Sequence, residues 1–270
     1  MPPVLIHPFS ASTLLIETRS NMASLSTGTG FLVRRENGKP ALVTARHVVT
    51  GRHHDTGVPL SVDGRVPDEI KVPRVAGVSQ DVAGRETIVI NVGEPVLAEL
   101  YAPGSIPLWV EHPTWGARVD VVALPLDEDV GRTITPFFGP GAPAERNLMV
   151  APGETVSVIG YPFGISVGAT LGLWVTGTIA SEPGVEFAGL PMFVIDCRTR
   201  EGQSGSPVVA LRSGWAVVDG QGRLGGGPYY RFLGVYTGRI RGDSDLGLVW
   251  KATVVAEILA ELNRRDVATA

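Results

Sequence analysis

Short apolar runs, each bounded by glycine or proline, are the feature that most limits how this chain can fold. The 34 glycines and 21 prolines make up 55 of the 270 residues, and they follow no Gly-X-Y repeat. Short runs of β-branched and apolar residues between such breakers are typical of strands. The strings STLLIETR, GTGFLVRR and PALVTA show this pattern, and the turn-forming ENGKP joins the last two. We therefore expect an all-β fold.

Helical periodicity is confined to the C-terminal end of the sequence. In WKATVVAEILAELNRR, five apolar residues recur at spacings of three and four, which predicts a helix over residues 251–265. They are Val254, Val255, Ile258, Leu259 and Leu262. The polar residues 131–153, rich in Gly and Pro, are interpreted as a linker between two β halves, 1–130 and 154–250.

Charge and composition exclude several classes of partner. The formal net charge is −4, which argues against generic polyanion binding, so no nucleic-acid partner is expected. The sequence has no stretch of about 18 uninterrupted apolar residues and its N-terminus lacks a secretory pattern. We therefore expect no membrane association and a cytoplasmic location. Cys197 is the single cysteine, so no intrachain disulfide can form.

Three segments carry side chains suited to nucleophilic hydrolysis. His47 follows an apolar strand in LVTARHVV, Asp120 lies in the apolar string RVDVVALPL, and Ser204 lies in the tight turn EGQSGSPVV. An ionised carboxylate among valines needs a partner, and a glycine turn can aim backbone N–H groups at one spot. Each segment alone also fits a structural role. Together, their order along the chain is that of chymotrypsin-like proteases.

The strings around these residues resemble successive landmarks of the HtrA (Deg) branch of trypsin-like serine proteases. They include GTGFLV, VIGYPFGI, VTGTIAS, IDCRTREGQSGSPVV and FLGVYTGRI. The resemblance covers about residues 26–50 and 115–262. It implies a chymotrypsin-like double antiparallel β-barrel with a C-terminal helix and an active site between the barrels. His47 and Asp120 would belong to the first barrel and Ser204 to the second.

The resemblance also implies a role for each residue. Ser204 Oγ would attack the scissile carbonyl, His47 would accept its proton, and Asp120 would hold the imidazole tautomer. The backbone N–H groups of Gly202 and Ser204 would form the oxyanion hole. The function implied is a serine endopeptidase acting on proteins or peptides, with neither a metal nor a cofactor.

The sequence departs from this family in two places that bear on function. The 73 residues from His47 to Asp120 exceed the usual spacing of the HtrA branch, which predicts an insertion within residues 51–110, in the form of extra hairpins near the cleft. Gln203 stands where digestive relatives carry the aspartate that pairs with a freed N-terminus. That switch cannot operate here, so the oxyanion loop is either ready as made or ordered by another contact.

By the same resemblance, the primary specificity pocket lies between Arg198 and the strand after the nucleophile. Val235, Tyr236 and Thr237 would line it. A guanidinium pointing inward would favour acidic side chains in the substrate. A guanidinium turned to solvent would leave a shallow apolar pocket, which is the arrangement we favour.

Several alternatives stay open at this point. Asp81 in SQDVAG is a rival for the acid, although the buried strand expected after a triad aspartate is broken there by Gly84 and Arg85. The HHD string at 53–55 could suggest a metal, but adjacent histidines on a polar loop are usually exposed, and we expect none. The protein could instead be a non-catalytic peptide-binding pseudoprotease, a chaperone-like module or an esterase. The oligomeric state is not predicted.

Overall fold

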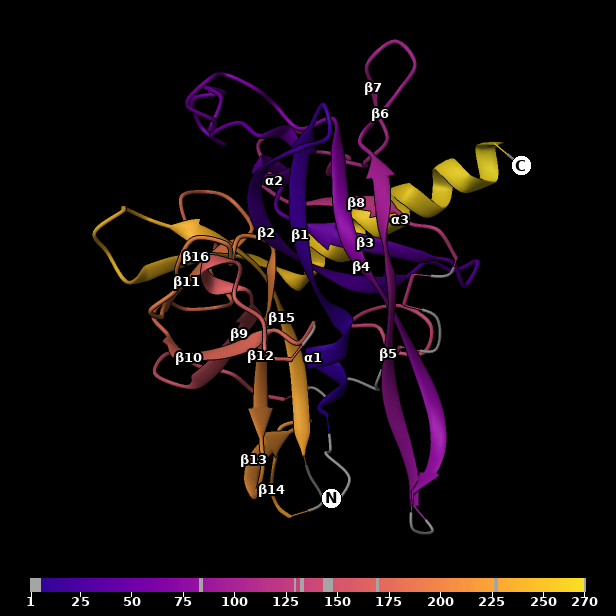
Figure 1. Ribbon diagram of the computed structural model, residues 1–270. Coiled ribbons are helices and arrows are strands. Elements are labelled where there is room, and N and C mark those ends of the chain that lie inside the picture. Colours follow the sequence, from indigo (N-terminus) through magenta and orange to yellow (C-terminus); the bar gives the residue numbers. More distant parts are fainter. Residues whose placement is uncertain are drawn as a thin grey trace.

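The structure is a computed structural model in which two β-rich halves pack side by side (Figure 1). It describes residues 6–82, 85–128, 130–131, 134–142, 148–168, 170–225 and 228–269, with side chains except in 76–91 and 268–269. The expected all-β class with a C-terminal helix is confirmed. Among the described residues, no helix combines the length and apolar character needed to cross a membrane.

The N-terminal half is an antiparallel sheet of six strands in the order β5-β4-β1-β2-β3-β8. Its strands are β1 (Thr13–Ser20), β2 (Ala23–Arg34), β3 (Pro40–Thr44), β4 (Glu69–Val82), β5 (Arg85–Glu99) and β8 (Val122–Pro125). Two short strands, β6 (Tyr101–Ala102) and β7 (Ile106–Pro107), form a separate hairpin. In the sheet, Leu42 of β3 lies between Leu32 and Leu124. All three are buried, so this register places one apolar face in the core.

The C-terminal half is a closed barrel in the order β10-β11-β16-β15-β12-β9. The strands are β9 (Thr155–Gly160), β10 (Leu173–Ile179), β11 (Met192–Asp196), β12 (Ser206–Arg212), β15 (Tyr229–Arg239) and β16 (Leu246–Lys251). A hairpin of β13 (Trp215–Val218) and β14 (Gln221–Leu224) projects from it, and a short 3-10 turn, η1 (Pro162–Gly164), follows β9. Closure pairs both edges of each of the six barrel strands among the described residues.

The C-terminal helix α3 (Ala252–Thr269) packs back onto the N-terminal half (Figure 1). All five apolar residues that predicted it are buried in one core, together with Val119 and Val121 beside β8. Buried His112 contributes a polar contact, with its Nε2 2.9 Å from the Glu257 carboxylate of α3. The helix therefore joins the last strand of the barrel to the other half of the molecule.

The segment predicted as a linker also contributes to the core. Phe137 is 1% exposed, and its ring stacks on Phe9 at a centroid distance of 4.5 Å. It also meets Phe31 and Phe232 edge to face or tilted. These rings come from both halves, so the segment fills the space between them as well as connecting them.

The predicted insertion contains the long β4–β5 hairpin, which extends beyond the rest of the molecule (Figure 1). Two short helices escaped the sequence analysis, α1 (Pro8–Ser12) and α2 (Arg46–Thr50). Five residues are too few to show a helical period. The end of α2 is encoded by Gly51, whose φ of +61° suits a left-handed cap and whose missing Cβ leaves room for Pro67.

Candidate active site

His47 and Asp120 are brought together by the pairing of β3 with β8. Thr44 of β3 lies opposite Val122 of β8. The chain that leaves β3 into α2 therefore passes Asp120, which lies two residues before β8. His47 Nδ1 lies 2.7 Å from Asp120 Oδ2, and the His47 backbone N–H donates to Asp120 Oδ1 at 2.9 Å. Asp120 is only 4% exposed. Both of its carboxylate oxygens therefore accept a hydrogen bond from one histidine.

The rival acid, Asp81, has a side chain that lies outside the described part of the structure. Its backbone pairs with Glu86 within the projecting β4–β5 hairpin. Among the described side chains, Asp120 is the carboxylate hydrogen-bonded to His47.

Two opposing effects set the proton affinity of His47. Burial lowers its pKa, whereas the Asp120 charge and the hydrogen bond that the ring donates to that carboxylate raise it, and the pKa ends above its ordinary value of about 6.5. The neutral ring keeps its proton on Nδ1, because Nδ1 faces the carboxylate. Nε2 is thereby left as the basic atom.

Ser204 lies in the turn between β11 and β12, and two glycines shape this turn. Gly202 and Gly205 have φ values of +88° and +90°. A Cβ at Gly202 would collide with the Tyr161 carbonyl oxygen, and one at Gly205 with the Thr29 carbonyl oxygen. Glycine is thus required at both positions. The Ser204 hydroxyl donates to the Thr237 carbonyl at 3.0 Å, and the described residues include no hydrogen bond from it to His47.

Two backbone N–H groups of this turn are those expected to form the oxyanion hole. Within the described part of the chain, the N–H groups of Gly202 and Ser204 donate no hydrogen bond. Between them, Gln203 is fully buried, and its Oε1 accepts the Arg200 backbone N–H at 2.8 Å. A neutral amide therefore closes the loop where digestive proteases use an aspartate.

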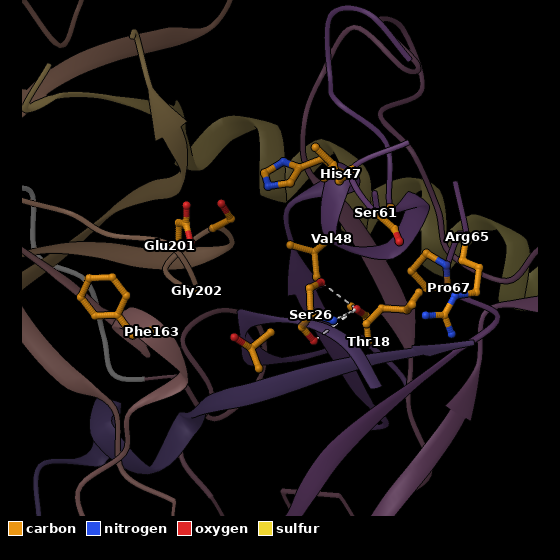
Figure 2. A pocket seen from close by; sticks show the side chains of 15 residues that line it. Thr18, Ser26, His47, Val48, Ser61, Arg65, Pro67, Phe163, Glu201 and Gly202 are labelled. Carbon is orange, nitrogen blue, oxygen red and sulfur yellow. Dashed lines mark hydrogen bonds between the residues drawn. The ribbon is translucent and has the colours of Figure 1, made fainter. Parts of the chain in front are cut away.

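A cleft of about 630 Å³ brings His47 and Ser204 to one surface. Figure 2 shows Glu201 and Gly202 on the wall from the C-terminal half, facing His47 on the wall from the N-terminal half. A second cavity of about 320 Å³ is also lined by His47 and contains Asp120 and Thr237 in its wall. His47 therefore lines both the cleft and the second cavity, and a substrate chain could occupy either.

Thr29, which the sequence analysis missed, ties the Ser204 turn to the N-terminal half. Its N–H donates to the Ser204 carbonyl at 2.9 Å, and its hydroxyl donates to the Gly202 carbonyl at 2.7 Å. The same hydroxyl accepts from the Tyr161 N–H at 3.1 Å, and the Thr29 carbonyl accepts from the Thr44 hydroxyl at 2.7 Å. The GTG string at 28–30 marked a strand but gave no sign of these contacts.

The four residues expected at the specificity pocket occupy different environments. The Arg198 side chain is 84% exposed and points toward Asp245, with an N–O distance of 3.9 Å. Val235 and Tyr236 are buried, and the Tyr236 hydroxyl is 2.6 Å from Thr199 Oγ1. Thr237 lines the 320 Å³ cavity. The arginine is therefore turned to solvent.

Cys197 offers no competing nucleophile. The thiol is buried, and burial together with neighbouring carboxylates raises its pKa to about 11, so it stays protonated at neutral pH. Among the described residues, no group of three or more His, Cys, Asp and Glu side chains is placed to hold a metal ion.

Solved structures of serine proteases share this fold. A serine endoprotease from Yersinia pestis matches with a TM-score of 0.51 and 14% identity, over 95% of this chain and 64% of that one. The thermostable protease AL20 from an extremophilic microorganism matches with 0.52 and 14%, over 94% and 98%. The Rv3671c protease from M. tuberculosis matches with 0.45 and 19%, over 93% and 81%.

The sequence profile of the trypsin-like peptidase domain matches residues 28–218, and the chain belongs to this family. No curated protein sequence matches it significantly. The expected assignment to trypsin-like serine proteases is thereby confirmed, and the protein is a serine protease whose family acts on protein substrates.

Thr29→Val keeps the shape of the side chain but removes its hydroxyl, leaving the Gly202 carbonyl and Tyr161 N–H without their partner. We expect the free energy of unfolding to fall by roughly 1–3 kcal/mol, measured by urea denaturation. Thr29→Ser retains the hydroxyl and is the matched control. Equal stability of the Val and Ser variants would contradict the role given to these hydrogen bonds.

The His47 ring should titrate above about 6.5, because Asp120 favours its charged form more than burial opposes it. At pH 6.5 more than half of His47 should therefore be protonated, measured by NMR titration of the ring. Asp120→Asn removes the carboxylate charge and should lower the midpoint. An unchanged midpoint in this variant would rule out Asp120 as the cause.

Proposed function

We propose that the protein is an HtrA-like serine endopeptidase that cleaves peptide bonds through an acyl-enzyme, with His47, Asp120 and Ser204 as its triad. The observation that carries the proposal is the short His47–Asp120 hydrogen bond at the edge of a cleft that also contains Ser204. A buried carboxylate that orients a histidine beside a serine is the arrangement that activates a hydroxyl nucleophile.

The mechanism begins with a rotation of the Ser204 hydroxyl away from the Thr237 carbonyl toward His47 Nε2. Ser204 Oγ then attacks the scissile carbonyl carbon while Nε2 takes the hydroxyl proton, and Asp120 stabilises the imidazolium. The free N–H groups of Gly202 and Ser204 hold the oxyanion. Nε2 next protonates the leaving amine, and a water activated by His47 hydrolyses the acyl-enzyme.

Substrate preference follows from which side chains fill the specificity pocket. Arg198 points to solvent and lies 3.9 Å from Asp245, so this side chain supplies no cation to the pocket for an acidic residue. Tyr236 is buried, and its ring lies 2.7 Å from where a Cβ on Gly247 would stand, so the ring packs against Gly247 of β16. We expect a shallow pocket that accepts small apolar side chains before the scissile bond.

Two other functions on the same fold make different predictions. A pseudoprotease or chaperone-like module would bind peptides without an activated serine, and an esterase would turn over esters but not peptides. The ordered His47–Asp120 pair favours catalysis over binding alone, since a binding module has no need of an oriented base. Peptide and ester substrates compared side by side separate the protease from the esterase.

A fluorophosphonate probe should label Ser204, because it reacts with a serine whose hydroxyl is activated by a base. Ser204→Ala should abolish labelling and lower kcat by at least about 10³-fold on a confirmed peptide substrate. Ser206→Ala is the matched control, since this neighbouring serine is fully buried. Labelling that persists in Ser204→Ala, with native circular dichroism, would refute the proposed nucleophile.

A peptide-library cleavage profile should show Ala and Val enriched before the cut, and Arg198→Ala should leave this pattern unchanged because the side chain is exposed. Tyr236→Val should extend the preference to larger apolar residues by emptying the space of the ring. The melting temperature of the Tyr236→Val variant shows whether its fold is retained. Enrichment of Asp or Glu that disappears in Arg198→Ala would overturn this assignment.

A further inference from the structure

A second histidine faces the carboxylate of Asp120. His54 lies in the loop after α2, and its Nδ1 is 3.6 Å from Asp120 Oδ1. The ring meets Trp250 edge to face, with the centroids 6.3 Å apart. Nδ1 is buried and has no hydrogen-bond partner among the described residues. The loop was expected to be exposed, yet it places this atom beside the centre of the site.

His54 Nδ1 and Asp120 Oδ1 could each make one more hydrogen bond than they do. Asp120 Oδ1 accepts the His47 backbone N–H and, as a carboxylate oxygen, can accept a second hydrogen bond. The His54 atom is buried without a partner, which costs free energy. At 3.6 Å the two atoms are too far apart for a hydrogen bond, and a movement of less than about 1 Å would bring them within range.

The loop that carries His54 also forms part of both hollows beside His47. Gly51 and Leu60 line the 630 Å³ cleft, while His53, His54 and Leu60 line the 320 Å³ cavity. A peptide in either hollow therefore contacts the loop. Hydrogen bonds in catalytic sites are often long without substrate and shorten when it binds.

We propose that His54 is a positioning residue that closes onto Asp120 Oδ1 when a peptide fills the cavity, fixing the carboxylate for His47. His54 acts through Asp120 and does not touch the reacting atoms. The inference deepens the proposed function and rests on it for its catalytic consequence. The contact between the two side chains can be tested without catalysis.

The charges around His54 determine whether its removal makes His47 easier or harder to protonate. Asp120 and Asp55 are the carboxylates that line its cavity, and His47, His53 and Arg239 are the basic side chains there. An N–H of His54 aimed at Asp120 stabilises that negative charge and weakens its pull on the His47 proton. Removing His54 should therefore make His47 easier to protonate.

The test is an NMR titration of the His47 ring in a Ser204→Ala parent, which cannot cleave, with a saturating Ala-Val-containing peptide bound. His54→Leu fills the site without a donor, and His54→Gln restores a neutral donor. His53→Asn is the control: it keeps a side-chain acceptor for the Asp55 and Thr56 N–H groups, and the described contacts of His53 include none with Asp120. With peptide bound, we expect the His47 midpoint to rise by about half a pH unit in His54→Leu. It should return toward the parent value in His54→Gln and change less in His53→Asn than in His54→Leu.

Kinetics on a cleaved peptide supply the catalytic readout. We expect kcat to fall about tenfold in His54→Leu, with a smaller change in KM and substantial recovery in His54→Gln. Equal His47 midpoints in the peptide-bound parent and its His54→Leu variant, or a loss that His54→Gln does not restore, would overturn the positioning role. If wild type neither cleaves nor reacts with fluorophosphonate, the proposed function fails, and the titration still decides the contact with Asp120.

Discussion

The hydrogen bonds of Thr29 are the contact on which the geometry of the site depends. His47 and Ser204 lie in different halves of the molecule, so no single sheet fixes the distance between them. Thr29, in β2 of one half, bonds both the Gly202 and Ser204 carbonyls of the other. The two carbonyls point toward Thr29, which leaves the N–H groups on the opposite side of the turn free for a ligand. One residue, through its backbone N–H and its hydroxyl, thus joins the two halves at the proposed oxyanion hole.

The second constraint is the buried charge of Asp120. A carboxylate that is 4% exposed must be compensated, and here the two hydrogen bonds to it come from His47. The same bonds that make this burial tolerable fix the ring and its tautomer. Stability and function therefore depend on one interaction, and a substitution at Asp120 should disturb both. His54 stands where a third donor could share that charge.

The sequence was sufficient to predict features that a local pattern encodes. The periodicity of α3 and the strands of the first half follow from apolar spacing. The cost of a buried charge showed only that Asp120 needs a partner, and its pairing with His47 was expected from the family resemblance. Thr29 could not be found this way, because its partner Gly202 lies 173 residues further along the chain. His54 was misjudged for a related reason. The loop pattern indicates an exposed segment, and it cannot show that Trp250 of the distant barrel strand β16 contacts the His54 ring.

Gln203 completes this arrangement without a charge. In digestive relatives a buried aspartate before the nucleophile needs an ammonium partner, and the oxyanion loop is ordered only when cleavage supplies one. The Gln203 amide carries no charge, so its burial requires hydrogen bonds and no counterion. Its Oε1 accepts the Arg200 backbone N–H within the same loop at 2.8 Å, and the Gln203 backbone N–H donates to the Arg200 carbonyl at 3.2 Å. The buried Nε2 has no partner among the described residues. Both bonds join groups of the same loop, and neither involves a charged group or a chain terminus.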